Sequence, residues 1–198
     1  MTKKFFAQVI SFIFHPIFFT LFIPLLIVHR KTGDWMYSFK WTAFSGVFLL
    51  VALLFFYIVR PKDFFSDFDI SKKEQRHLFY SISLLLAVMY FIAALIFKGI
   101  LFPLSIVSLG IILGLVVFDI VNYYIKASIH LAVVTAYVVT MAIVYGLVPF
   151  FAMIGMVALV GWSRIYLKKH TQAEAVAGML LGAAVTVVTF WISLLIKI

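Results

Sequence analysis

The chain is a succession of long apolar runs separated by short polar stretches. We interpret seven of these runs as membrane-spanning helices, at residues 5–28, 41–59, 78–97, 101–124, 129–147, 149–166 and 175–196. A helix rises about 1.5 Å per residue, so roughly 20 apolar residues cross a hydrocarbon core about 30 Å thick. The shortest connections, at Lys98-Gly99 and at 146–149, contain Gly or Pro, which favours tight turns. The pattern predicts an all-α polytopic transmembrane bundle of six to seven spans, forming a single domain over residues 1–198.

Composition supports this prediction and narrows the class of partner. The chain is 66% hydrophobic and only 12% charged, whereas a soluble domain is roughly 25% charged. It contains no cysteine, which excludes disulfides and thiolate metal sites. The net charge of +9 comes from cations in short loops beside apolar runs, where they would meet lipid headgroups or anionic substrates. We therefore expect a multi-pass membrane protein whose partners are membrane lipids and not nucleic acid. Its oligomeric state does not follow from the sequence.

Three polar loops should lie on one side of the membrane. Two predicted spans separate residues 60–77 from residues 126–130, and two more separate these from residues 164–174. That side, with the N-terminus, carries eleven Lys or Arg residues against five on the other, which places the three loops in the cytoplasm by the positive-inside rule. Setting aside four cations that could serve chemistry leaves seven against five, so the orientation rests on a narrow margin.

The same three loops collect the residue types that handle phosphate. They hold three histidines, several cations and several acids: His77, His130, His170, Arg76, Lys126, Arg164, Asp63, Asp67, Asp69, Glu74 and Glu174. Guanidinium and ammonium groups neutralise phosphoryl oxygens. One imidazole can attack phosphorus while another protonates the leaving oxygen. The loops thus form a candidate site for phosphoryl chemistry.

The loop after the sixth predicted span resembles a known signature. SRIYLKKHTQAEAVAG, residues 163–178, is similar to the third signature of the type 2 phosphatidic acid phosphatase (PAP2) superfamily, SRxxxxxHxxxD, with Glu174 at the Asp position. KASIH, residues 126–130, resembles a degenerate second signature, PSGH. The first signature, KxxxxxxRP, is altered, because His77 follows Arg76 and Asp69 occupies the Lys position. The resemblance therefore describes a divergent member with a PAP2-like core.

The resemblance implies a role for each matching residue. His170 resembles the nucleophile that forms a phosphohistidine, Glu174 the carboxylate that orients it, and His130 the general acid for the leaving oxygen. Phosphate-binding roles fall to four residues: Arg164, Ser128, Lys126 and Arg76. The implied activity is metal-independent and cofactor-free removal of phosphate from a lipid phosphate or an isoprenyl diphosphate.

Each of these residues also has a structural interpretation. Thr171 to Glu174 fits a capping box, in which Glu174 bonds back to the Thr171 amide. His130 could simply begin a helix at the interface, and Ser128 could cap that helix. Asp119, inside an apolar run, is expected to pair with Lys126 two turns along the same face. His15-Pro16 predicts a kink with a buried polar partner in the first span, without chemistry.

Two other functions remain open. Asp63 and Asp67 form a DxxxD spacing that would suit a Mg²⁺-dependent intramembrane prenyltransferase, although the later loops offer only Glu174 as a second acid. The altered first and second signatures also fit a catalytically decayed lipid-binding or transport protein. Chelator sensitivity would distinguish the metal enzyme, and absence of phosphatase activity would favour decay.

Overall fold

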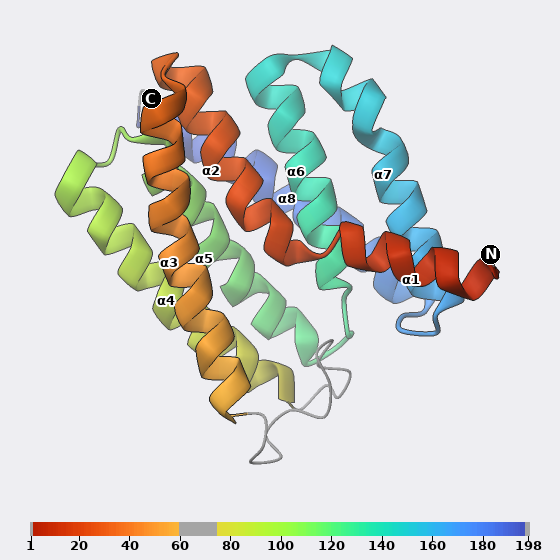
Figure 1. Cartoon of the computed structure of the whole chain (residues 1–198). Helices are drawn as coiled ribbons and strands as arrows, with labels where there is room; N and C mark the ends of the chain where they lie inside the picture. The colour runs from red at the N-terminus through yellow and green to blue at the C-terminus, as the bar shows by residue number, and fades with distance from the viewer. Residues whose placement is uncertain (1, 60–74, 197–198) are drawn as a thin grey trace.

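The chain folds into helices throughout the part that the structure describes. The structure, a computed structural model of the chain, describes residues 2–59 and 75–196. The described helices are α1 (Lys3–Ile13), α2 (Pro16–Thr32), α3 (Trp35–Val59), α4 (Gln75–Lys98), α5 (Pro103–Asn122), α6 (Ile129–Tyr145), α7 (Leu147–Tyr166) and α8 (Gln172–Leu195). They form one bundle of elongated helices (Figure 1).

The lengths of these helices fit a membrane bundle. Five of the described helices, α3, α4, α5, α7 and α8, are long and apolar enough to cross a bilayer, and α1 with α2 makes a sixth if the bent pair is one span. The remaining helix, α6, is shorter and packs inside the bundle, with buried residues from His130 to Met141. These apolar helices indicate an integral membrane protein. The predicted helical class is thus confirmed at this coarse level.

The predicted first span, residues 5–28, is broken into two helices. α1 ends at Ile13, α2 begins at Pro16, and their axes differ by 41°. Proline restricts the preceding residue to extended backbone, and His15 accordingly has φ −68° and ψ 138°. The imidazole Nδ1 of His15 then accepts from the Ile17 amide at 3.3 Å, which caps α2. The predicted kink at His15-Pro16 is confirmed, but it is a break and not a bend within one helix.

Two glycines bring α8 against α6. A Cβ atom at Gly178 would lie 2.3 Å from the Ser128 carbonyl oxygen, and one at Gly182 would lie 2.2 Å from the Ala132 carbonyl oxygen. Only a hydrogen fits at these distances, and small residues four apart are how membrane helices approach closely. The start of α8 is therefore held beside the start of α6.

The polar segments of the candidate site gather at one end of the bundle. In Figure 1 the start of α4 and the segments 123–128 and 167–171 lie at the same end, and α1 runs crosswise there, beside α6 and α7. The connections around Gly33, Gly99 and Gly146 lie at the opposite end. We call these the site end and the far end.

Candidate functional site

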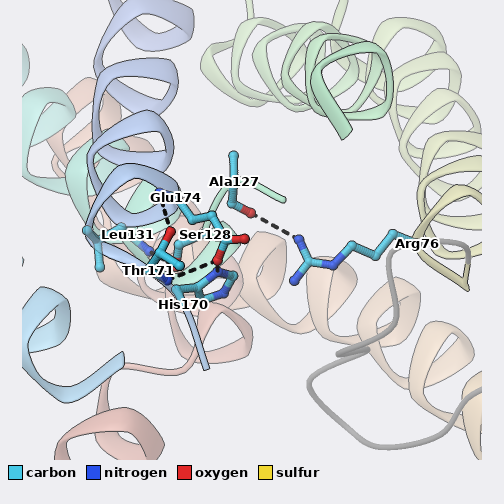
Figure 2. A network of polar contacts seen from close by, with 7 residues as sticks. All are labelled: Arg76, Ala127, Ser128, Leu131, His170, Thr171 and Glu174. Carbon is cyan, nitrogen blue, oxygen red and sulfur yellow. Dashed lines mark hydrogen bonds and ion pairs between the residues drawn. The ribbon is translucent and has the colours of Figure 1, made fainter. Parts of the chain in front are cut away.

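The imidazole of His170 is held by Glu174 at the start of α8. His170 Nδ1 lies 3.1 Å from Glu174 Oε2, and the same oxygen accepts the Thr171 amide at 3.0 Å (Figure 2). The Glu174 amide in turn donates to Thr171 Oγ1 at 3.2 Å, which completes a capping box. The capping box is therefore confirmed, and the carboxylate that forms it also bonds His170.

The first turns of α6 and α8 meet behind this pair. The Ser128 amide donates to the Glu174 carbonyl oxygen at 3.0 Å. Ser128 is fully buried and caps α6, because its hydroxyl oxygen accepts the Leu131 amide at 3.5 Å. Both helices thus direct their N-termini, the positive ends of their dipoles, toward the same region, an arrangement that favours an anion.

Arg164 connects the end of α7 to the loop that carries His170. Its carbonyl oxygen accepts the amides of Lys169 and His170 at 3.0 and 3.4 Å, which folds the loop back over the helix end. Its side chain is only 2% exposed, and Nη1 donates to Ser11 Oγ of α1 at 2.8 Å. The guanidinium is thus buried and oriented by a helix far away in the sequence.

Arg76 reaches the same region from α4. It is 2% exposed, and its Nη1 donates to the Ala127 carbonyl oxygen at 3.0 Å, next to Ser128. Figure 2 shows its side chain extending from α4 toward His170 and Glu174. Lys126, half-buried in the segment between α5 and α6, adds another cation to this end.

These surroundings keep His170 neutral. Burial, followed by the positive charges of Arg164, Arg76 and Lys126, lowers the pKa of His170 from its ordinary 6.5 to about 4, against the opposing effect of the hydrogen bond that Glu174 accepts. An ionised carboxylate only accepts hydrogen bonds, so the Nδ1 of a neutral His170 carries the proton. Its Nε2 then holds a lone pair at neutral pH, and the imidazole can act as a nucleophile.

His130 lies in the first turn of α6, two residues after Ser128. It is 7% exposed, and its ring packs edge to face against His15, with centroids 4.9 Å apart and planes at 88°. The structure thus places His130 at the site end, on the helix whose start contacts Glu174.

Asp119 has a partner that the sequence did not predict. Its carboxylate bonds Nδ1 of His77, in the first turn of α4, and the expected pairing with Lys126 stays a prediction. The other ring nitrogen of His77 lies 3.5 Å from Asn122 Nδ2. The expectation considered a single helix face and therefore missed the packing of α4 on α5. The pair fixes the start of α4, where Arg76 also lies.

The sequence interpretation missed several residues that shape this end. Ser11, which bonds Arg164, gave no local signal. His15 was expected to have a buried polar partner but no chemistry, and its ring contacts the buried His130. Gly178 and Gly182 have the four-residue spacing typical of close helix contacts, and that signal was available.

Metal ligands do not cluster in residues 2–59 and 75–196, where no group of three or more His, Asp or Glu side chains could hold an ion. Asp63 and Asp67, the suggested Mg²⁺ ligands, lie outside the described residues.

Comparison with known proteins gives no relative: no family model matches the chain, and neither a curated protein nor a solved structure matches it significantly.

Proposed function

We propose that this protein is a membrane-embedded phosphohydrolase that removes phosphate from a lipid phosphate or an isoprenyl diphosphate through a phosphohistidine at His170. The observation that carries the proposal is a buried imidazole with a depressed pKa of about 4, bonded to Glu174 and surrounded by the charges of three cations. A neutral nucleophile beside several positive charges suits attack on an anionic phosphorus centre.

The proposed reaction has two steps. Nε2 of His170 attacks phosphorus, the bond to the leaving oxygen breaks, and that oxygen takes a proton from His130. Water then gives a proton to the neutral His130 while its oxygen attacks phosphorus. The phosphorus–nitrogen bond breaks, its electron pair returns to Nε2, and inorganic phosphate leaves. Glu174 keeps the Nδ1 proton oriented and stabilises the positive imidazolium between the steps.

The cations near His170 would neutralise the negative charge of the phosphoryl group. Arg164 and Arg76 are both buried, and guanidinium groups bind phosphoryl oxygens bidentately. Lys126 would provide the charge that the altered first signature no longer places at its Lys position. The N-termini of α6 and α8 add the positive ends of two helix dipoles.

The resemblance of residues 163–178 to the third PAP2 signature supports the same assignment, with Arg164 and His170 in register. In this proposal the lipid tail stays in hydrocarbon while its phosphate reaches the site end. The excess of Lys and Arg on that side favours a cytoplasmic orientation.

Hydrolysis by the purified protein tests the proposal. Wild-type protein in detergent should release phosphate from a short-chain lipid phosphate, and His170→Ala should reduce the rate to background. His29→Ala, a histidine of the far end, is the matched control and should retain wild-type activity. Acid-labile radioactive phosphate should be trapped on the wild type and be absent from His170→Ala.

Three outcomes would overturn the proposal. Label that persists on His170→Ala would place the nucleophile elsewhere, and no hydrolysis by the wild type would indicate a lipid-binding protein. Loss of turnover in EDTA would favour the metal-dependent alternative at Asp63 and Asp67, because the histidine mechanism uses no metal.

A further inference from the structure

The break between α1 and α2 places two polar side chains against the proposed catalytic groups. Ser11, in the last turn of α1, accepts a hydrogen bond from Arg164 at 2.8 Å. His15, the residue between the two helices, packs edge to face on His130 at 4.9 Å. In a continuous helix over residues 5–28, Ser11 would lie along the extended axis of α2, whereas the 41° bend turns α1 away from that axis.

The contact of Ser11 orients the guanidinium of Arg164. An arginine has five N–H donors in a fixed plane, so one bond from Nη1 to Ser11 sets the direction in which the others point. A second hydrogen bond, from Ser163 Oγ to the Ala7 carbonyl oxygen at 2.7 Å, holds α1 on α7 at the same level. The position of α1 thus determines how Arg164 presents itself to a ligand.

The contact of His15 orients the ring of His130. His15 is itself fixed, because its Nδ1 accepts the Ile17 amide at 3.3 Å and Pro16 locks the backbone that follows. Aromatic rings prefer such edge-to-face contacts, which restrict the tilt of both partners. A general acid must hold its proton-bearing nitrogen toward the leaving oxygen, so this restriction bears directly on proton transfer.

We propose that Ser11 and His15 are positioning residues of the phosphohydrolase site, Ser11 for Arg164 and His15 for His130. This inference rests on the proposed function and adds the N-terminal helix pair to the machinery. Neither residue touches the reacting atoms; each acts through the side chain that it orients.

His15→Asn tests the second contact without removing the helix cap. Asparagine is among the best N-cap residues, so the start of α2 and the bend should persist while the ring is lost. Turnover of an alkyl phosphate, whose leaving oxygen needs a proton, should fall about tenfold. Turnover of p-nitrophenyl phosphate, whose leaving group departs without protonation, should change less than about twofold. Equal losses on both substrates, or no loss on either, would overturn the role of His15.

Ser11→Ala tests the first contact, with Ser11→Thr as the variant that keeps the hydroxyl. Alanine favours the helix, so α1 should still form. Binding of inorganic orthovanadate, measured by isothermal titration calorimetry, should weaken about tenfold in Ser11→Ala, because a hydrogen bond to a charged group is lost. It should recover in Ser11→Thr. Unchanged binding in Ser11→Ala would overturn the role of Ser11.

The two proposals can fail separately. If His170→Ala is inactive while His15→Asn and Ser11→Ala behave as wild type, the phosphohydrolase stands and the positioning roles are wrong. If the wild type hydrolyses nothing, vanadate binding still decides the role of Ser11. If the wild type binds no vanadate, the positioning role of Ser11 is wrong as well.

Discussion

The two ends of the bundle carry similar residue types in opposite surroundings. At the far end Arg30 is exposed, lies 5.7 Å from the Tyr145 ring and donates to the Val144 carbonyl oxygen at 3.3 Å. Lys98 is likewise exposed and lies 5.1 Å from the Tyr37 ring. The histidine there, His29, stacks on Trp35 at 3.6 Å. These side chains anchor helix ends at the interface, as cations and aromatic residues beside membrane spans ordinarily do.

At the site end the cations are buried and surround an imidazole. Arg76 and Arg164 are each 2% exposed, and both lower the pKa of His170. Both side chains are cations, so a ligand that binds beside them would be an anion such as a phosphoryl group. Histidines and cations occur at both ends, so neither residue type alone distinguishes a candidate site. The site end differs because its arginines are buried around one oriented imidazole.

The largest difference in activity between the two ends is expected when one arginine is removed from each. Arg164→Met keeps the length of the side chain but removes its charge and donors, and it should lower kcat/KM for a lipid phosphate about 100-fold or more. Arg30→Met at the far end should change kcat/KM less than about twofold, because Arg30 is exposed. Steady-state kinetics on both variants measure this. Similar losses at both ends would show that the effect is structural and not electrostatic.

The packing of α8 on α6 should also be sensitive to a single methyl group. Gly178→Ala would place Cβ 2.3 Å from the Ser128 carbonyl oxygen, so the helices must separate. The expected cost in free energy of unfolding is about 1–3 kcal/mol, with lower activity, because Glu174 lies one turn before this contact.

Gly155→Ala in α7 is the matched control, since a Cβ atom there meets nothing within 4 Å. Thermal unfolding in detergent should separate the two variants. An equally stable Gly178→Ala would contradict the close contact.

The sequence predicts helices best where lipid leaves the backbone no other way to form its hydrogen bonds. Runs such as 101–124 must be helical, because lipid offers no partner for backbone polar groups, and α5 indeed occupies Pro103–Asn122. The start of α3 at Trp35 was missed because the polar residues before Trp41 hid it, although Asp34 accepts the Tyr37 amide at 3.0 Å. Local chemistry thus decides helix ends that hydrophobicity does not.

The candidate site follows from the sequence only where its contacts are local. The His170–Glu174 bond joins residues four apart, and the resemblance of this segment to the third PAP2 signature implied it. The Arg164–Ser11 bond spans 153 positions in the chain and carries no local pattern. The Asp119–His77 pair likewise depends on the packing of two helices, so no local pattern in the sequence indicates it.

The pKa of His170 should respond to cations of the site end alone. Arg76→Met removes a charge that lowers this pKa, so the midpoint should rise from about 4 toward the ordinary 6.5. Lys98→Met at the far end should leave it unchanged. Titration of ¹³C-labelled histidine by NMR, assigned with His170→Ala, measures the midpoint. A midpoint in Arg76→Met equal to that of the wild type would contradict the proximity of the two residues.

The same depressed pKa predicts how stability depends on pH. Between pH 6.5 and about 4 the unfolded chain binds a proton that the folded chain does not, because the folded pKa lies lower. The contribution of His170 to stability is therefore fully present above pH 6.5 and is lost as the pH falls toward 4. Arg76→Met should weaken this dependence.

The smallest effect should come from the helix caps. Thr171 caps α8 at the site end and Asp34 caps α3 at the far end, each by accepting a backbone amide near 3 Å. Replacing either with alanine should cost about 1 kcal/mol of stability. Only Thr171→Ala should also lower turnover, by a few-fold, because the Thr171 cap holds the turn in which Glu174 orients His170. Equal turnover in the two variants, at equal loss of stability, would mean that Glu174 keeps its position without the cap.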